Sequence, residues 1–266
     1  YHFIPKFSYI CKENIALISM DSLTNNTRKI YASLGTAKGR RTTGLFMAQG
    51  TKCVLDTYGH FKCECVLATS QWIESHPTVP ALAVKGIDLE RISTLSTPPQ
   101  VVAIYHIPED DGAEYNDQEL CLALDCVQDP GNLGTIIRVA DWMGIRNIFA
   151  SLDTADVWNP KVVQSTMGAI SRVKVHYLQL ADFLGSLHNV PVYGTFLEGD
   201  NIYKIELTSH GIIVMGNEGN GISHEVGRYV TNKLHIPSYP VGVPTSESLN
   251  VAIATAITLS EFRRNG

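Results

Sequence analysis

The sequence predicts an α/β protein of two domains, the second of which is built on a parallel β-sheet. Three observations favour this fold. From about residue 118 onward, short apolar runs alternate with segments of helical periodicity, which is typical of a parallel sheet covered by helices. An acidic stretch that contains Pro and Gly separates this part from the first hundred residues. The length of 266 residues accommodates two domains of ordinary size.

The predicted elements follow this pattern in chain order. Residues 1–19 match no pattern and are assigned as an extension of unknown role. Residues 20–107 are assigned as a smaller α/β domain that ends on an apolar strand at 101–107, residues 108–117 as the acidic linker, and residues 118–266 as the second domain. In the second domain we expect strands at 120–127, 147–151, 173–178, 190–196, 212–215 and 233–237, and helices at about 132–143, 161–170, 181–188, 224–230 and from 248 onward.

The composition excludes disordered and fibrous proteins, because 44% of the residues are hydrophobic and 18% are charged. No run approaches the roughly 20 apolar residues that a membrane helix needs. Residues 1–19 lack the apolar core and the cleavage site of a signal peptide. Six cysteines without a C-x-x-C pair indicate a reducing compartment. We therefore expect a cytoplasmic protein with no membrane partner.

Two cysteines raise the question of a metal site. Cys63 and Cys65 flank Glu64, and residues i and i+2 share one face of a strand, where they could meet a metal. Two half-buried strand cysteines are the favoured interpretation, and no metal is expected.

The charge is unevenly distributed along the chain. The net charge of −5 gives no global sign of a nucleic-acid-binding protein. However, residues 1–110 carry 11 basic and 9 acidic side chains, whereas residues 111–266 carry 10 and 17. One basic run in the first domain, which also contains Tyr31, suits phosphate contact and base stacking, and a solvated helix end is an equal alternative. The five cations of this run are Arg28, Lys29, Lys38, Arg40 and Arg41.

A first motif follows the first strand of the second domain. The strand runs into Asp129-Pro130-Gly131 and then into a helix, which places Asn132 at the helix cap and Arg138 on the second turn. Arg138 needs a polar partner in this apolar stretch. An ion pair with Asp141 at i+3 is the structural alternative to a functional role.

A second motif, Gly216-Asn217-Glu218-Gly219-Asn220-Gly221, follows a buried strand. Its three glycines let the backbone approach a ligand without obstruction by a Cβ atom. The spacing differs from the dinucleotide-binding fingerprint, and the motif lacks the Lys of a phosphate-binding P-loop. A flexible loop between strand and helix is the alternative.

A third motif joins Ile236-Pro237 to Ser248-Leu249-Asn250, which begin a helix rich in small residues. Ser248 and Asn250 are expected in its first turn, where side-chain oxygens and free backbone N–H groups can face a ligand. Simple helix caps are the alternative.

Together and in this order, the three motifs resemble the SpoU/TrmH family of RNA ribose 2′-O-methyltransferases, within the SPOUT superfamily. The family pattern N-x-G-x-x-x-R matches Asn132, Gly134 and Arg138, and G-x-E-x-x-G matches Gly216, Glu218 and Gly221. The pattern I-P followed by S-L-N matches the third motif. The resemblance covers residue 20 to the end, since residues 23–50 look like the start of the family's ribosomal-protein-like RNA-binding domain.

The resemblance implies a fold and a reaction. It implies a deep trefoil knot in the second domain, S-adenosylmethionine as cofactor, RNA as substrate and a homodimer with the last helix at its interface. Ribosomal RNA is favoured over tRNA because the first domain is basic. A non-catalytic RNA-binding or assembly factor on the same fold is the alternative from a different class, against which the complete polar set argues.

The resemblance also implies the roles of single residues. Because a guanidinium is effectively always protonated in proteins, the matching arginine is expected to stabilise the attacking oxygen and to bind phosphate rather than act as a base. The predicted catalytic residues are Asn132, Arg138, Glu218, Ser248 and Asn250. The predicted cofactor-binding residues are Gly216, Asn217, Gly221, Ile236 and Leu249.

Overall fold

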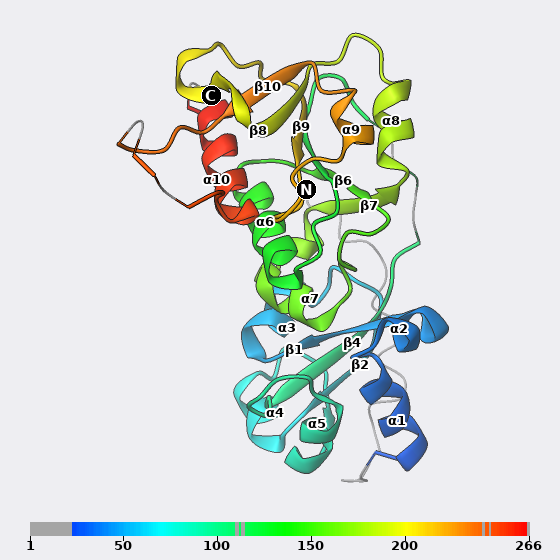
Figure 1. Ribbon diagram of the computed structural model, residues 1–266. Helices are drawn as coiled ribbons and strands as arrows, with labels where there is room; N and C mark the ends of the chain where they lie inside the picture. The colour runs from blue at the N-terminus through cyan, green and yellow to red at the C-terminus, as the bar shows by residue number, and fades with distance from the viewer. Residues whose placement is uncertain (1–22, 110–111, 113–114, 241–242, 245, 265–266) are drawn as a thin grey trace, which may run out of the picture. The chain divides into compact units, whose positions relative to one another are not determined.

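Figure 1 shows the computed structural model of the chain, which describes residues 23–109, 112, 115–240, 243–244 and 246–264. The chain divides into two compact units: unit 1 ends at Pro108 and unit 2 begins at Glu109. The extension assigned to residues 1–19 lies outside the described residues, as does part of the stretch assigned as the acidic linker.

Unit 1 contains a four-stranded sheet with strand order β1-β4-β2-β3. Strand β4 is antiparallel to β1 and β2, whereas β3 is parallel to β2. Its elements are α1 (Asn25–Ser33), α2 (Ala37–Thr43), β1 (Leu45–Gln49), α3 (Thr51–Thr57), β2 (Cys63–Ala68), α4 (Ser70–Ser75), β3 (Leu82–Ala83), α5 (Gly86–Ile92) and β4 (Val101–His106). Helices α1, α2 and α4 each begin at a threonine whose hydroxyl accepts a backbone N–H of the first turn.

Unit 2 contains a six-stranded sheet in which all the pairings are parallel, with strand order β10-β8-β9-β5-β6-β7. This confirms the parallel α/β fold predicted from the alternating pattern. Its elements are β5 (Leu120–Leu124), α6 (Pro130–Trp142), β6 (Asn147–Ser151), α7 (Pro160–Thr166), η1 (Ala169–Ser171), β7 (Lys174–Leu178), α8 (Leu180–Ser186), β8 (Val192–Asn201), η2 (Ile202–Lys204), β9 (Gly211–Met215), α9 (His224–Gly227), β10 (Asn232–His235) and α10 (Val251–Phe262).

Helix α6 lies against both α7 and α10 (Figure 1). Gly134 of α6 explains how closely α7 approaches it. A Cβ atom on Gly134 would lie 2.4 Å from Cβ of Ser165 and 2.9 Å from the carbonyl oxygen of Val162. Neither neighbour is the far end of a flexible side chain, so a larger residue would push the two helices apart. The glycine of the first motif therefore has a packing role.

Several element bounds differ from the predicted ones. The helix expected at 161–170 ends at Thr166, because Met167 and Gly168 both adopt left-handed backbone conformations. The last helix begins at Val251 rather than at residue 248, because Asn250 is its N-cap. Strand β8 extends to Asn201, beyond the predicted end at 196.

In the part of the chain that the structure describes, no helix is both long enough and apolar enough to cross a membrane.

Candidate active site

The strand order places a candidate site at the carboxyl ends of β5 and β9. After β5 the chain adds β6 and β7 on one side, and β8, β9 and β10 lie on the other. In open parallel sheets, ligands bind at such a reversal point. Here the amide of Asn217 donates to the carbonyl of Cys126 at 2.8 Å, and the N–H of Ser223 donates to Asp125 Oδ2 at 2.6 Å. These bonds tie the loop after β9 to the turn after β5.

The glycine loop after β9 folds back on itself. Asn217 and Gly221 exchange backbone hydrogen bonds of 3.0 and 2.9 Å, and Gly221 has a φ of +69°. A Cβ atom on Gly216 would lie 2.3 Å from the backbone of Gly221, so a side chain has no room there. The side-chain oxygen of Asn217 accepts the N–H groups of Gly219 and Asn220 at 2.9 and 3.1 Å. The side chain of Asn217 thus shapes the loop.

A chain of three polar side chains joins the three sequence motifs. Asn132 donates through Nδ2 to Glu218 Oε1 at 2.5 Å, and Asn250 donates through Nδ2 to Asn132 Oδ1 at 2.9 Å. The oxygen of the Asn250 side chain also accepts the N–H groups of Ala252 and Ile253, which caps α10. We call Glu218, Asn132 and Asn250 the polar chain. Residues that are up to 118 positions apart in the sequence therefore meet at one point.

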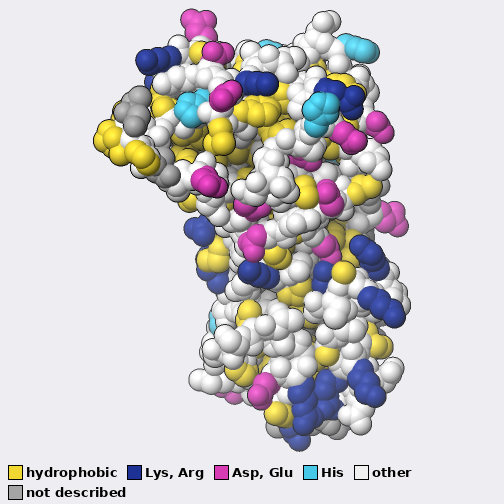
Figure 2. All heavy atoms as spheres, viewed as in Figure 1, with side chains coloured by type: hydrophobic (Ala, Val, Ile, Leu, Met, Phe, Trp, Pro, Cys, Tyr) yellow, Lys and Arg dark blue, Asp and Glu magenta, His cyan; other side chains and the backbone are white. Residues whose placement is uncertain are grey.

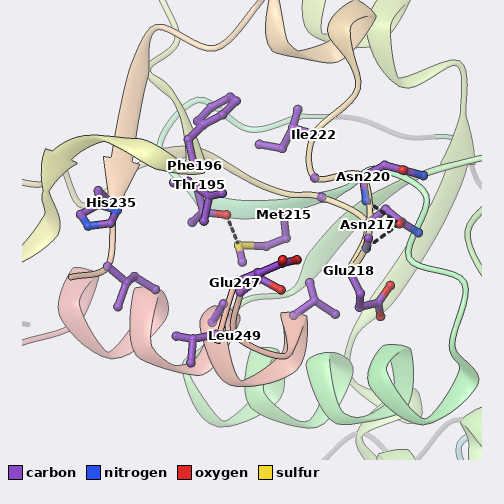
Figure 3. Close-up of a pocket in the computed structure, with 18 of the residues that line it drawn as sticks. Thr195, Phe196, Met215, Asn217, Glu218, Asn220, Ile222, His235, Glu247 and Leu249 are labelled. Carbon is purple, nitrogen blue, oxygen red and sulfur yellow. Dashed lines mark hydrogen bonds between the residues drawn. The ribbon is translucent and has the colours of Figure 1, made fainter. Parts of the chain in front are cut away.

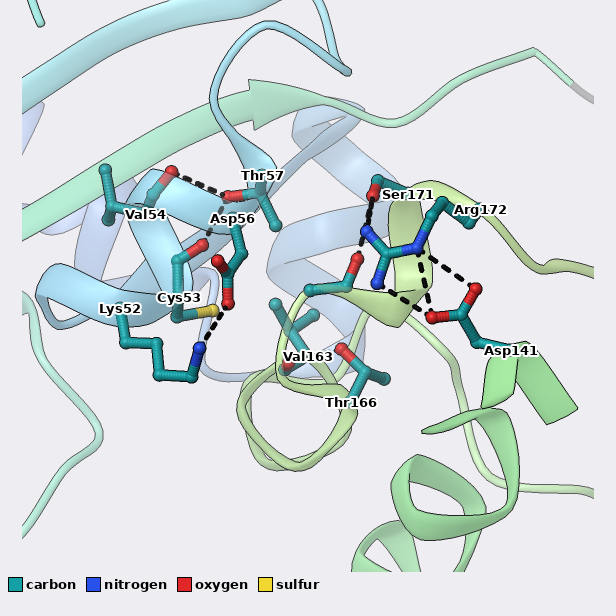
Figure 4. A network of polar contacts seen from close by, with 11 residues as sticks. Lys52, Cys53, Val54, Asp56, Thr57, Asp141, Val163, Thr166, Ser171 and Arg172 are labelled. Carbon is teal, nitrogen blue, oxygen red and sulfur yellow. Dashed lines mark hydrogen bonds and ion pairs between the residues drawn. The ribbon is translucent and has the colours of Figure 1, made fainter. Parts of the chain in front are cut away.

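Arg138 lies on the exposed side of α6 and, among the described residues, makes no hydrogen bond or ion pair. The alternative partner, Asp141, instead binds Arg172 through Nη2 at 2.8 Å and Nε at 3.0 Å (Figure 4). The guanidinium of Arg138 is consequently open to a ligand. It does not line the cavity described next.

A cavity of about 710 Å³ opens beside the polar chain (Figure 3). All five predicted cofactor-binding residues line it, together with Glu218 and Ser248. Gly219, a glycine of the second motif, also lines it. Sequence reasoning missed the rest of the lining, which is Thr195, Phe196, Leu197, Glu198, Met215, Asn220, Ile222, Lys233, His235, Glu247, Val251 and Ala254. Four of these residues belong to β8, where the register against β10 jumps from Lys233↔Gly194 to Leu234↔Asp200. Gly199 was the sequence signal for this irregularity in the strand. A Cβ atom at this position would lie 2.7 Å from the carbonyl oxygen of Lys233, so the two backbones can approach only at a glycine.

The lining of the cavity is partly apolar and carries an excess of carboxylates. Glu198, Glu218 and Glu247 line it, against one ammonium group, that of Lys233. The Lys233 ammonium lies 5.1 Å from the centroid of the Phe196 ring, which is a cation–π distance. A cavity with this charge favours a ligand that carries a positive charge beside an apolar portion.

The thiol of Cys126, in the turn after β5, is not an activated nucleophile. A hydrogen bond with Asp153, followed by burial, raises the pKa of the Cys126 thiol to about 11. The thiol is therefore protonated at neutral pH, and protonated thiols react poorly.

Part of the predicted RNA-contact set is wrong. Arg40 is 2% exposed, and its guanidinium donates to the carbonyl of Leu34 at 2.8 Å, so it cannot reach RNA. Arg28 is largely buried and forms an ion pair of 3.3 Å with Asp88. Tyr31, the predicted stacking residue, belongs to the core of unit 1.

The remaining cations of the run, Lys29, Lys38 and Arg41, are exposed. Figure 2 shows Lys and Arg side chains gathered on one face of unit 1.

Cys63 and Cys65 are both half-buried on β2, as the favoured interpretation predicted. The register against β4 shifts between them, so the simple alternation of strand faces does not hold at this point. Among the described residues, no group of three His, Cys, Asp or Glu side chains could hold a metal ion.

Comparison with known proteins decides the family. A model of the SpoU rRNA Methylase family matches residues 119–260, which is more than half of the chain. The chain belongs to the SpoU rRNA methylase family. This confirms the resemblance drawn from the three motifs, and it makes the protein an enzyme of the RNA methyltransferase class.

Members of this family match over nearly the whole chain. The 23S rRNA (guanosine(2553)-2'-O)-methyltransferase RlmP of Bacillus subtilis is 29% identical over 255 residues, which cover 92% of this chain and 98% of the relative. A TrmH-family structure from Porphyromonas gingivalis is 39% identical with a TM-score of 0.82, and the match covers 92% of this chain and 100% of that one. An AdoMet-bound rRNA methyltransferase from Sinorhizobium meliloti is 31% identical with a TM-score of 0.78, over 91% and 96% of the two chains.

Proposed function

We propose that this SpoU-family protein transfers a methyl group from S-adenosylmethionine to a ribose 2′-hydroxyl of ribosomal RNA. The polar chain carries the proposal, because it unites the three motifs beside a cavity at the reversal point of the sheet. The relative RlmP, which matches nearly end to end, is named for 2′-O-methylation of 23S rRNA. This favours ribosomal RNA over tRNA as the substrate.

The cavity fits the cofactor in size and in charge. Pockets for small molecules measure about 300–1,000 Å³, and the three carboxylates suit the positive sulfonium. Gly216, Asn217, Gly221, Ile236 and Leu249 would hold the cofactor, the glycines through backbone groups that no Cβ obstructs. When bound, S-adenosylmethionine supplies a methyl group that its sulfonium already activates.

The ribose hydroxyl is the difficult partner, because it is weakly acidic and must lose its proton during attack. We assign Arg138 to the developing oxyanion and to a phosphate of the same nucleotide, since its fork of N–H donors makes no contact within the described part of the chain. The polar chain, with Ser248, would orient Arg138 and the ribose.

A second copy of the chain completes this proposal. On α6, Thr135, Arg138 and Trp142 are exposed at i, i+3 and i+7, so they form one stripe. Trp142 is 88% exposed, and Ile253 on the adjoining α10 is 52% exposed. We propose that this two-helix face forms a homodimer that brings Arg138 close to the cavity of the partner subunit.

The finer assignments belong to the same proposal. Residues 20–107 would form a ribosomal-protein-like domain that binds RNA through Lys29, Lys38 and Arg41. Residues 118–266 would form the methyltransferase domain with a deep trefoil knot, joined by a linker at 108–117, in a cytoplasmic protein. The glycine loop and the segment on either side of residue 240 line one cavity, which is the arrangement a knot would produce at this edge.

The test uses labelled S-adenosylmethionine and RNA fractions from a strain that lacks the gene. We expect label in 23S rRNA, located at one ribose after nuclease digestion. Label in tRNA instead would correct the substrate. No label in any fraction would favour a non-catalytic assembly factor and overturn the proposal.

A further inference from the structure

Lys161, a lysine outside the predicted set, is linked to the polar chain through one intervening residue, Asp129. Lys161 is in the first turn of α7, and its Nζ lies 3.5 Å from Oδ2 of Asp129, the N-cap of α6. Its side chain is 64% exposed. A Cβ atom on Gly131 would lie 2.9 Å from Oδ1 of Asp129, which is closer than an ordinary contact, and 3.6 Å from Cε of Lys161, which is an ordinary contact.

Asp129 connects this lysine to the polar chain. The other carboxylate oxygen of Asp129 accepts the backbone N–H of Asn132 at 2.8 Å. The side chain of Asn132 contacts Glu218 and Asn250 in turn. A continuous run of contacts therefore leads from the ammonium of Lys161 to all three members of the polar chain.

The carboxylates around Asn132 make this part of unit 2 negatively charged. Residues 111–266 carry 17 acidic and 10 basic side chains, and Asp129 and Glu218 both contact Asn132. An approaching RNA backbone would be repelled by these carboxylates unless cations met its phosphates. In the proposed dimer, Arg138 of the partner subunit is one such cation, and Lys161 is a second.

We propose that Lys161 binds a phosphate of the RNA strand next to the target ribose and so positions that ribose over the polar chain. This inference rests on the proposed function. An exposed ion pair of 3.5 Å contributes little to stability because water screens it, so Lys161 can exchange Asp129 for a phosphate at little cost. Lys161 is thus a positioning residue for the reaction.

A structural role for Lys161 makes a different prediction. If the lysine served only to hold Asp129 and the start of α6, then losing either partner would have the same effect. Asp129→Asn separates the two roles, because Asn is as good an N-cap as Asp and yet removes the carboxylate that competes with phosphate.

The experiment compares Lys161→Gln and Asp129→Asn with Lys174→Gln as the control. Lys174 lies at the amino end of β7, whereas the polar chain lies beyond the carboxyl ends of β5 and β9. RNA affinity is measured across a salt series, alongside single-turnover methylation at limiting and saturating RNA and the affinity for S-adenosylmethionine. The wild-type protein is assayed first, so a failure to methylate RNA would count against the proposed function before the variants are compared.

We expect Lys161→Gln to weaken RNA binding about three- to tenfold at 0.1 M salt and to reduce the salt slope by about one. Its rate at saturating RNA and its cofactor affinity should stay close to those of the wild type. Asp129→Asn should bind RNA as tightly as the wild type or more tightly, and Lys174→Gln should match the wild type. Unchanged RNA affinity in Lys161→Gln, or an equal loss in Lys161→Gln and Asp129→Asn, would overturn the proposal.

Discussion

At the scale of single residues, two arginines of unit 2, Arg138 on α6 and Arg172 at the end of η1, differ in their contacts. Arg172 donates through Nε to Oδ1 and through Nη2 to Oδ2 of Asp141, which is a bidentate contact (Figure 4). Arg138 makes no hydrogen bond or ion pair within the described residues. Because the guanidinium of Arg138 has no partner there, it contributes no ion pair or hydrogen bond to the stability of the isolated subunit. Its donors are available for a phosphate or an oxyanion, and this separates Arg138 from a structural cation.

The first prediction concerns the geometry of that guanidinium. Because a lysine presents one point charge and cannot reproduce a bidentate contact, both Arg138→Lys and Arg138→Ala should lower the single-turnover rate by about 10² to 10³-fold. Calorimetric affinity for S-adenosylmethionine should be nearly unchanged, since Arg138 does not line the cavity. A Lys variant with almost full rate would refute the assigned role.

The second prediction concerns the glycine loop. Gly216→Ala would place a Cβ atom 2.3 Å from the backbone of Gly221, so the loop must shift, and we expect a loss of cofactor affinity of at least about tenfold. Gly227→Ala is the matched control, because Gly227 does not line the cavity and a Cβ atom there would lie 4.0 Å from Cγ2 of Ile222, an ordinary contact. Calorimetry on both variants, with melting temperatures to verify folding, tests this. Equal affinities in the two variants would contradict it.

At the scale of elements, the start of α10 combines a cap with a link to the site. Asn250→Asp keeps an oxygen that can accept the N–H groups of Ala252 and Ile253, but it removes the donor to Asn132. Asn250→Ala removes both functions. We expect Asn250→Ala to lower the free energy of unfolding by about 1 kcal/mol, Asn250→Asp to leave it nearly unchanged, and both variants to lose methylation. Full activity in Asn250→Asp would show that the link is dispensable.

The fourth prediction uses the two faces of α2. Lys38 and Arg41 are three residues apart and share the exposed face, while Arg40 points into unit 1. Arg41→Glu should weaken RNA binding and flatten its salt dependence, with little effect on the melting temperature. Arg40→Glu should instead lower the melting temperature of the protein, because it buries a carboxylate against a carbonyl oxygen. Thermal melts beside binding at several salt concentrations distinguish the two outcomes.

The positions of most strands could be predicted from the sequence, whereas the extension of β8 and the burial of Arg40 were missed. Strands β5, β6 and β9 are short, mainly apolar runs, so their positions follow from local composition. The extension of β8 does not, because it depends on a register shift against a strand thirty residues later. The burial of Arg40 was available from helical periodicity, since a run of cations on a helix cannot all face the same side.

At the scale of the whole molecule, the three motifs predicted the polar chain only as members of a family pattern. Local reasoning left Asn132, Glu218 and Asn250 as a cap, a loop carboxylate and a second cap. Their contacts span 86 and 118 residues of sequence. Asn132 meets Glu218 because β5 and β9 are neighbours in the sheet, and it meets Asn250 because α10 lies against α6. No local pattern encodes that neighbourhood.

The last prediction concerns assembly. Trp142 and Ile253 are exposed on adjoining helices, and exposed apolar side chains that lie together are typical of an interaction surface. In a two-fold dimer each substitution occurs twice, so one unpaired carboxylate in each subunit is costly. Ile253→Asp should therefore raise the dimer dissociation constant by roughly 100-fold or more, and Trp142→Ala should raise it as well. Ile87→Asp is the control, because Ile87 is similarly exposed, at 47%, but lies on α5 in unit 1. Light scattering across a concentration series measures the dissociation constants of all three variants.

If the dimer brings Arg138 to the partner subunit's cavity, methylation should fall with the dimer fraction while each subunit retains cofactor affinity. A monomeric Ile253→Asp variant that methylates RNA at the wild-type rate would refute the proposed assembly of the site.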